Sequence, residues 1–270
     1  MLICQLTDLH LRPEGVPAYR VVETNMLTER SFRAVAALTP APEAVLITGD
    51  LTDTGQAVEY QLFQTLVDRH LSTPVFVIPG NHDEREQFRR NLGHFRGVTD
   101  DSRFVQYVVD ELPVRLIMLD TVVPGADHGE LCPDRLAFLD RALQAEPNRP
   151  TIIAMHHPPF ACGIGHMDRI GLRNPEDFAA IVSRYSQVER IICGHQHRPV
   201  VGRVAHAIAL IAPSVAHQVE LDLREGAPGA FVMEPPAYYL HRWTESEGIV
   251  SHTGYVERWP GPFPFSGDAD

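Results

Sequence analysis

The chain of 270 residues contains no lysine, so all 23 of its basic residues are arginine. This absence excludes catalysis through a lysine Schiff base and phosphate binding by a P-loop lysine. Basic charge is scarce as well, because 35 acidic residues give a formal net charge of −12. A protein that binds duplex nucleic acid usually presents a dense basic face. We therefore expect no duplex nucleic acid as a partner.

Cysteines and long apolar runs are also few. The four cysteines (Cys4, Cys132, Cys162 and Cys193) form no Cys-x-x-Cys pair, which argues against a disulfide framework and a thiolate zinc site. No apolar run approaches the roughly 20 residues of a membrane span. The first ten residues are typical of a strand rather than of a secretory leader. These features predict a cytoplasmic protein without a membrane partner.

Short apolar segments rich in β-branched residues alternate with amphipathic ones along the first two hundred residues. This alternation is typical of βαβ units and predicts an α/β fold built in layers. Helical periodicity is clearest over Glu59–Leu71, Asp134–Ala145 and Pro175–Ser186. The expected strands are Leu2–Leu6, Ala44–Thr48, Val75–Pro79, Phe104–Val109, Val114–Leu119, Thr151–Met155, Arg190–Cys193 and Ala207–Ala212.

The C-terminal part has a different pattern. Ala237–Trp243 and Ile249–Val256 flank the turn sequence Thr-Glu-Ser-Glu-Gly, which predicts a β-hairpin. We therefore expect a catalytic domain over residues 1–220, followed by a C-terminal hairpin extension and tail over residues 221–270.

The predicted hairpin is rich in large apolar side chains, including Tyr238, Tyr239, Leu240 and Trp243. One small ribbon cannot bury them by itself. We expect the hairpin to pack on a neighbouring subunit, which would give a dimer or a higher homo-oligomer. The alternative is that it packs on the core of its own chain.

Polar side chains with metal-binding chemistry follow five of the predicted strands. In open α/β sheets, ligands bind beyond the carboxyl ends of the strands, so these residues are expected to converge on one crevice. Any one of the motifs alone is better explained as an ordinary turn, but five such sets at five strand ends favour a shared site. The residues are Asp8 and His10, then Asp50, then Asn81, His82 and Asp83, then His156 and His157, and finally His195 and His197.

Carboxylate, imidazole and amide donors without thiolate suit manganese, iron, zinc or cobalt. A single metal ion with four or five coordination positions cannot bind all seven donor residues. Two metal sites that share a bridging carboxylate can use them all. We expect Asp83 to cap a helix that begins at Glu84 rather than to bind metal. The expected ligands are Asp8, His10, Asp50, Asn81, His156, His195 and His197.

Five motifs follow one another along the chain, namely Asp8-x-His10, Gly49-Asp50, Gly80-Asn81-His82-Asp83, His156 and Gly194-His195-x-His197. In this order they resemble the signature of the calcineurin-like metallophosphoesterases. The resemblance spans residues 1 to about 200. Beyond these residues, the chain resembles the bacterial class III phosphodiesterase branch. The similarity to the glycerophosphodiesterase members of this branch includes Ala216-His217-Gln218-Val219. The resemblance implies two β-sheets packed face to face and flanked by helices.

The resemblance also implies residue roles. His82 would face the substrate phosphate and stabilise charge or protonate the leaving group, with Asn81 and His217 as further substrate contacts. Asp53 would orient His82 as a dyad partner. Two divalent metal ions (Fe, Mn, Zn or Co) would be held, the first by Asp8, His10, Asp50 and His197, and the second by Asp50, Asn81, His156 and His195, with Asp50 as the bridge.

The implied activity is hydrolysis of small phosphodiesters, glycerophosphodiesters in particular, by a metal-bridging hydroxide. Hydrolysis of 3′,5′-cyclic nucleotides is the alternative. A non-catalytic scaffold that keeps the fold is a third possibility, although no expected ligand is missing. Nuclease activity is disfavoured by the acidic charge. Arg12, Tyr19 and Arg20 are either contacts to the substrate head group or ordinary loop residues.

Overall fold

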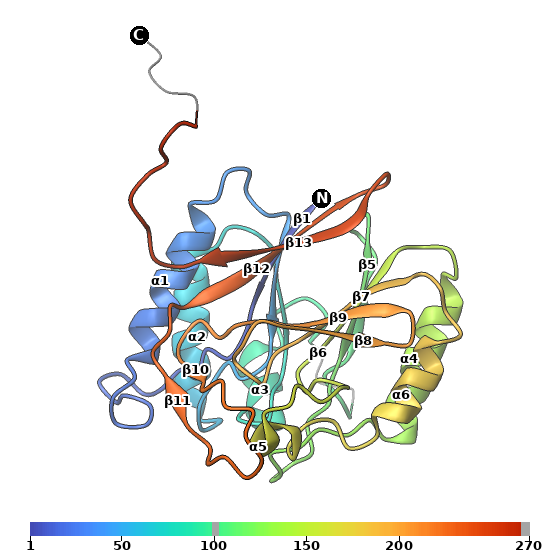
Figure 1. Ribbon diagram of the computed structural model, residues 1–270, viewed down its shortest axis with the longest axis horizontal. Helices are drawn as coiled ribbons and strands as arrows, with labels where there is room; N and C mark the ends of the chain where they lie inside the picture. Colours follow the sequence, from blue (N-terminus) through green and yellow to red (C-terminus); the bar gives the residue numbers. More distant parts are fainter. Residues whose placement is uncertain (99–102, 266–270) are drawn as a thin grey trace.

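The structure, a computed structural model, describes residues 1–98 and 103–265. Two β-sheets lie face to face between two groups of helices, as expected (Figure 1). The first sheet is covered by α1 (Thr24–Ala36), α2 (Ala57–His70) and α3 (Arg85–Leu92). On the opposite side of the molecule, α4 (Pro133–Ala145) and α6 (Pro175–Val182) cover the second sheet. A single helical turn forms α5 (Gly165–Asp168).

The first sheet has five strands in the order β13-β12-β1-β2-β3. The three N-terminal strands are parallel, and the C-terminal hairpin continues the sheet in antiparallel fashion on the other side of β1. β1 and β2 have the predicted bounds, whereas β3 ends one residue earlier, before Pro79, which has no N–H to donate. The strands are β1 (Leu2–Leu6), β2 (Ala44–Thr48), β3 (Val75–Ile78), β12 (Ala237–Thr244) and β13 (Gly248–Tyr255).

The second sheet has six strands in the order β4-β5-β6-β7-β9-β8. Its four central strands are parallel, and both edge strands are antiparallel to their neighbours. A separate antiparallel pair is formed by β10 (Gln218–Val219) and β11 (Phe231–Val232). The strands are β4 (Tyr107–Val109), β5 (Arg115–Leu119), β6 (Thr151–Met155), β7 (Val188–Cys193), β8 (Val200–Val204) and β9 (Ala207–Ile211).

The side chains of the second sheet alternate between its two faces, and this divides the hydrophobic core into two layers. Successive side chains of a strand point to opposite faces. Leu116, Met118, Ile152 and Ala154 therefore join the cluster that contains the first sheet. Their neighbours in sequence pack against α4 and α6 instead, and these are Ile117, Leu119, Ile153 and Met155. All these side chains are fully buried.

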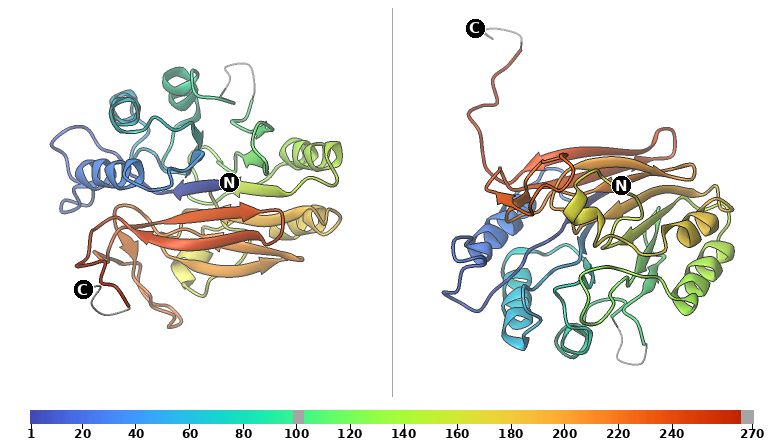
Figure 2. Two further views of the ribbon diagram at one scale, coloured as in Figure 1. Left: turned by 90° about the horizontal axis from the view of Figure 1, so that it is seen from above. Right: turned by 60° about the horizontal axis from the view of Figure 1, so that its bottom comes forward.

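The hairpin packs on its own chain, which was the alternative expectation. β12 pairs with β1 in the first sheet, and Tyr238 and Tyr239 are each only 5% exposed. Beyond β13 the chain leaves the body of the molecule, as the right-hand view of Figure 2 shows. In the described part of the chain, no helix has both the length and the apolar character required to cross a membrane.

The helices differ from expectation in several details, and α6, for example, ends at Val182 rather than at Ser186. Helix α1 was not predicted, and α3 begins one residue later than expected, with Glu84 as its N-cap. The Glu84 carboxylate accepts hydrogen bonds from the backbone N–H groups of Glu86 and Gln87. The expectation that Asp83 caps this helix is therefore wrong. Asp83 is buried and accepts hydrogen bonds from other backbone groups, among them the N–H groups of Gly80 and Leu51.

Candidate metal centre

The polar segments that follow five parallel strands meet at one place in the molecule. Asp8 follows β1, Asp50 follows β2 and Asn81 follows β3, while His156 and His195 follow β6 and β7 of the other sheet. The backbone N–H of His195 donates to both carboxylate oxygens of Asp8 at 3.1 Å. The site is thus built across the junction between the two sheets.

The first ligand group has two imidazoles whose Nε2 atoms face each other. His10 Nε2 and His197 Nε2 lie 3.1 Å apart. The Nδ1 atom of His10 donates to the Asp53 carboxylate at 3.1 Å, and that of His197 donates to the His217 carbonyl at 2.9 Å. In the neutral form of each ring, both facing nitrogens are unprotonated, an arrangement that a cation between them would stabilise. The group, whose ligand atoms lie within 4.8 Å of one another, comprises Asp8, His10, Asp50 and His197.

The second ligand group is centred on the side-chain oxygen of Asn81. This oxygen lies 3.1 Å from His156 Nε2 and 2.9 Å from His195 Nδ1. His156 Nδ1 is 2.8 Å from the Thr48 carbonyl and must donate to it, so Nε2 is the nitrogen that would bind a metal, once its proton has left. His195 Nε2 is buried and has no hydrogen-bond partner. These donors, too, fit a divalent cation.

Asp50 lies between the two groups. Its Oδ2 atom is 3.6 Å from His10 Nε2 and 3.4 Å from His156 Nε2, while Oδ1 accepts a hydrogen bond from the backbone N–H of His82. Burial opposes ionisation of Asp50, but the neighbouring His156 and His82 hold its pKa well below the usual range. Burial likewise disfavours charge on His156, yet Asp50 raises the pKa of this imidazole to about 9. The same negative field would attract a metal ion.

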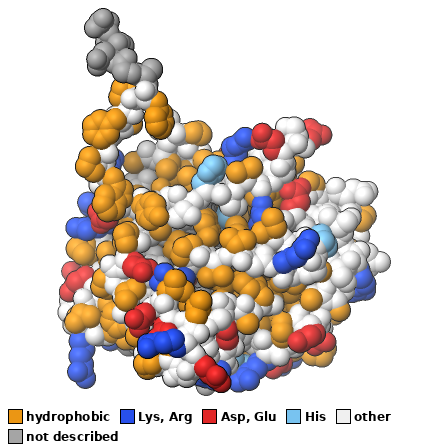
Figure 3. Space-filling model, viewed as in Figure 1, with side chains coloured by type: hydrophobic (Ala, Val, Ile, Leu, Met, Phe, Trp, Pro, Cys, Tyr) orange, Lys and Arg blue, Asp and Glu red, His pale blue; other side chains and the backbone are white. Residues whose placement is uncertain are grey.

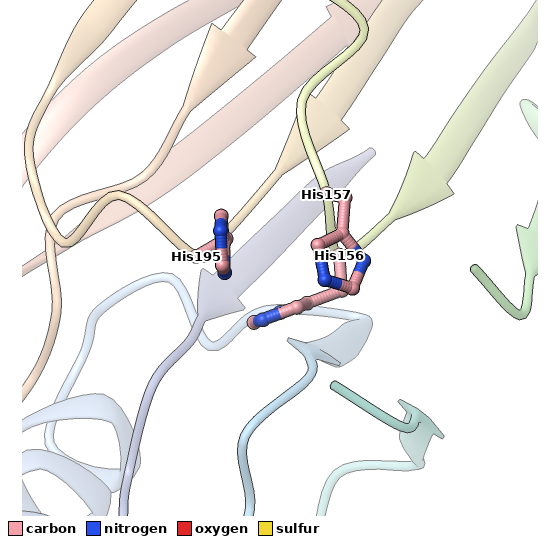
Figure 4. Close-up of side chains that lie close together, drawn as sticks. All are labelled: His156, His157 and His195. Atoms are coloured by element: carbon pink, nitrogen blue, oxygen red, sulfur yellow. The ribbon is translucent and has the colours of Figure 1, made fainter. Parts of the chain in front are cut away.

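His157 lies beside the second group, as Figure 4 shows together with His156 and His195. Both of its ring nitrogens already have protein partners. Nδ1 is 2.7 Å from the Thr121 hydroxyl, and Nε2 is 3.1 Å from the Asp127 carbonyl. Burial and the neighbouring His195 hold the pKa of His157 well below its usual range. His157 therefore anchors a loop and is not available as a ligand.

Five of the seven candidate ligands have left-handed backbone conformations. Their φ angles are 55° at Asp8, 48° at His10, 49° at Asp50, 72° at His195 and 49° at His197. This conformation costs a non-glycine residue roughly 1–2 kcal/mol. Such strain concentrates at functional sites, where the surrounding structure enforces it.

Two glycines allow the ligand segments to approach closely. A Cβ atom at Gly80 would overlap the carboxylate of Asp50, and one at Gly49 would overlap the imidazole of His156. Gly49 also has φ of +102°, which side chains rarely tolerate. Both positions therefore require glycine for the site to form.

Asp53 contacts more than one neighbour at the edge of the site. Its carboxylate accepts from His10 Nδ1 at 3.1 Å and from Arg12 at 2.9 Å. His82 Nδ1 lies 3.7 Å from this carboxylate and donates instead to the Asp53 carbonyl at 2.9 Å. Burial opposes protonation of His82, but Asp50 and Asp53 raise its pKa. The imidazolium form of His82 can donate a proton towards the adjoining cavity.

A cavity of about 590 Å³ opens over the two ligand groups. Tyr19 and His217 line it, as the sequence suggested, and so do Phe231, Asp127 and His166, which no motif pointed to. The Tyr19 ring lies 5.1 Å from that of His217 and 5.2 Å from that of Phe231. Hydrophobic periodicity gave no signal for these wall residues, because they come from a loop, a single helical turn and a two-residue strand.

Comparison with known proteins identifies the family of this chain and several relatives. The family model for calcineurin-like phosphoesterases matches residues 1–199. A probable glycerophosphodiester phosphodiesterase of Arcobacter nitrofigilis is 37% identical over 266 residues, which cover 98% of this chain and 97% of that protein. A 3′,5′-cyclic adenosine monophosphate phosphodiesterase of Pseudomonas aeruginosa is 32% identical over 218 residues, covering 81% of this chain and 77% of that protein.

Solved structures share the fold at much lower sequence identity. A dimetal phosphatase from Danio rerio superimposes with a TM-score of 0.68 at 14% identity, over 95% of this chain and 99% of that one. A purple acid phosphatase from yellow lupin gives a TM-score of 0.65 at 13% identity, over 94% of this chain and 53% of the other. These two similarities concern the fold alone.

Proposed function

The chain belongs to the calcineurin-like phosphoesterase family, and we propose that it hydrolyses small phosphodiesters, glycerophosphodiesters in particular, at a pair of divalent metal ions. The observation that carries this proposal is the convergence of imidazole nitrogens with carboxylate and amide oxygens from both sheets on one buried place. Asp8, His10, Asp50 and His197 would hold the first ion. Asp50, Asn81, His156 and His195 would hold the second, so that Asp50 is shared.

Two bound divalent ions supply Lewis acidity and a nucleophile derived from water at neutral pH. The side chains of the protein do the rest. Asp53 and the His217 carbonyl fix the orientation of two ligand imidazoles. His82, held through Nδ1 by the Asp53 carbonyl, would donate to the phosphate or to the departing alkoxide. The ring of His217 would contact the substrate from the cavity wall.

The cavity wall fits an alcohol portion of modest size. Tyr19, Phe231 and Met167 give it apolar surface, while Asp127 and His166 supply polar groups. Glycerophosphodiesters are favoured because the similarity to the Arcobacter relative covers nearly the whole chain, including the hairpin. Similarity to the cyclic adenosine monophosphate phosphodiesterase supports cyclic nucleotides as the alternative substrate.

We also propose the surroundings in which the protein works. Iron, manganese, zinc and cobalt all suit the ligand atoms, and the four free cysteines fit a cytoplasmic location. Residues 1–220 would form the catalytic domain. The extension over residues 221–270 would carry contacts of a homo-oligomer. Figure 3 shows hydrophobic side chains along the projecting C-terminal segment, where Trp259, Phe263 and Phe265 are 65% or more exposed.

A substrate panel tests the proposal directly. With Mn²⁺ or Co²⁺ added, the protein should cleave bis(p-nitrophenyl) phosphate and a glycerophosphodiester faster than 3′,5′-cyclic AMP. Asp50→Ala should lower kcat/KM by about 1000-fold or more because both metal positions lose a ligand. Asp68→Ala, on the exposed face of α2, is the matched control and should retain wild-type activity.

Three other outcomes would change the assignment. Wild-type turnover by Asp50→Ala would exclude the metal mechanism. A preference for the cyclic nucleotide would favour the alternative substrate. Absence of both bound metal and diester cleavage in the wild-type protein would favour a scaffold that keeps the fold without catalysis.

A further inference from the structure

A buried glutamine lies beneath the ligand groups, at the junction of the two sheets. Gln5 belongs to β1 and is completely buried. Its amide nitrogen donates to the Thr48 hydroxyl and to the Cys193 carbonyl, each at 3.0 Å. Its amide oxygen lies 3.1 Å from Nε2 of His241, on β12. One amide group thus links three strands of the first sheet to one strand of the second.

The direction of every hydrogen bond in this network is fixed. The Cys193 carbonyl can only accept, so the Gln5 nitrogen must face it and the Gln5 oxygen must face His241. Nε2 of His241 then carries the proton, and its Nδ1 accepts from the Ser251 hydroxyl at 2.8 Å. Donors and acceptors therefore run in one sense from Ser251 on β13 to the ends of β2 and β7. Such chains reinforce one another in a buried environment.

Both acceptors of the Gln5 amide are the last residues of strands that carry ligands. Thr48 ends β2, two residues before Asp50, and Cys193 ends β7, two residues before His195. The Thr48 carbonyl also accepts from Nδ1 of His156, which leaves Nε2 of that ligand free for a metal. Gln5 thus fixes the spacing of three ligand-bearing segments without being a ligand itself.

We propose that Gln5 is a positioning residue for the metal centre and that, through His241 and Ser251, it makes the C-terminal hairpin part of that centre. The inference rests on the proposed function, because it presupposes that the ligand groups bind metal. It explains how residues beyond 220, which supply no ligand, contribute to metal binding. Loss of the Gln5 amide would let the ends of β2 and β7 shift relative to each other.

Metal binding by the full-length apoprotein tests this role without reference to activity. Titration with Co²⁺, followed by calorimetry and by the visible absorption of the bound ion, should show about 10–100-fold weaker binding to Gln5→Leu, the loss typical of removing an outer partner of a metal ligand. Leu139→Ala is the matched control, because Leu139 is equally buried but lies on α4, on the side of the second sheet that faces away from the first sheet. It should lower stability while retaining wild-type Co²⁺ affinity.

A second variant decides the matter if Gln5→Leu does not fold. Ser251→Ala removes only one hydroxyl at the outer end of the network and should weaken Co²⁺ binding several-fold. Wild-type Co²⁺ affinity in folded Gln5→Leu, or in Ser251→Ala if the former does not fold, would overturn the inference. So would an equal loss of affinity in Leu139→Ala. Failure of the wild-type protein to bind Co²⁺ would instead overturn the proposed function.

Discussion

The two ligand groups differ in charge and in how firmly the protein holds them. The first contains two carboxylates, those of Asp8 and Asp50. In both of its imidazoles, Nδ1 donates a hydrogen bond to another residue of the protein. The second has only the shared carboxylate of Asp50, the amide of Asn81 and two imidazoles, and one of these, that of His195, has a buried nitrogen without a hydrogen-bond partner. The comparison teaches that two ligand groups that share one carboxylate need not be equivalent. We expect the first position to bind a divalent ion more tightly than the second.

Removing one ligand from each group should produce the largest contrast. Asp8→Ala takes a full negative charge from the first group, so kcat/KM should fall by about 1000-fold and stay low at any metal concentration. Asn81→Ala removes a neutral ligand from the second group, and high metal concentration should restore much of the activity. Activity measured against Mn²⁺ concentration checks this. Identical metal dependence of the two variants would show that the positions are equivalent.

Asp53→Asn should have an intermediate effect. The carboxylate of Asp53 accepts from His10 at 3.1 Å, so its loss should weaken metal binding at the first position by about 10–100-fold. The hydrogen bond between His82 and the Asp53 carbonyl does not involve the side chain and should remain. Calorimetric titration with Co²⁺ measures the effect. Unchanged affinity together with a shifted pH–rate profile would favour the dyad role with His82 over the orientation of His10.

The smallest expected effect concerns stability rather than catalysis, and it contrasts two buried histidines. Asp50 raises the pKa of His156, whereas burial, with a contribution from Arg190, lowers the pKa of His241 to about 3. His241 folds as the neutral form, so its contribution to stability is complete above its unfolded pKa of about 6.5 and is lost as pH falls from there towards 3.

Urea unfolding of the apoprotein at pH 7 and pH 5 measures this contribution. The free energy of unfolding should fall between these pH values by about 2 kcal/mol more in the wild type than in His241→Gln, which cannot titrate. Equal losses in the two proteins would mean that His241 is not held in its neutral form. The comparison within one pair of proteins cancels the titration of the other groups.

The strand pattern of the sequence predicted the sheets well because buried parallel strands have a strong local signature. β1, β2 and β6 have the predicted bounds. The site was predictable for a related reason, since strand ends of parallel sheets meet at one edge. The backbone at Asp8 and His10 was not predictable, because both residues are left-handed rather than extended like the strand before them. No local pattern encodes that conformation.

Other features depend on contacts between distant segments. The sequence showed the apolar side chains of the hairpin but not that β12 would pair with β1, which buries Tyr238 and Tyr239 within the chain. Part of the cavity wall was missed for the same reason, because Asp127 and Phe231 lie about a hundred residues apart. Patterns within one segment carry little information about such neighbours.

The left-handed backbone at five of the ligands has a consequence for protein engineering. Only glycine, asparagine, aspartate and, to a lesser degree, histidine adopt this conformation readily. Few residue types can therefore replace Asp8, His10 or Asp50, and this limits attempts to change which metal the site prefers. Exchanges among aspartate, asparagine and histidine would preserve the main chain. Glutamate or a β-branched residue would strain it, even where the new side chain has suitable donor atoms.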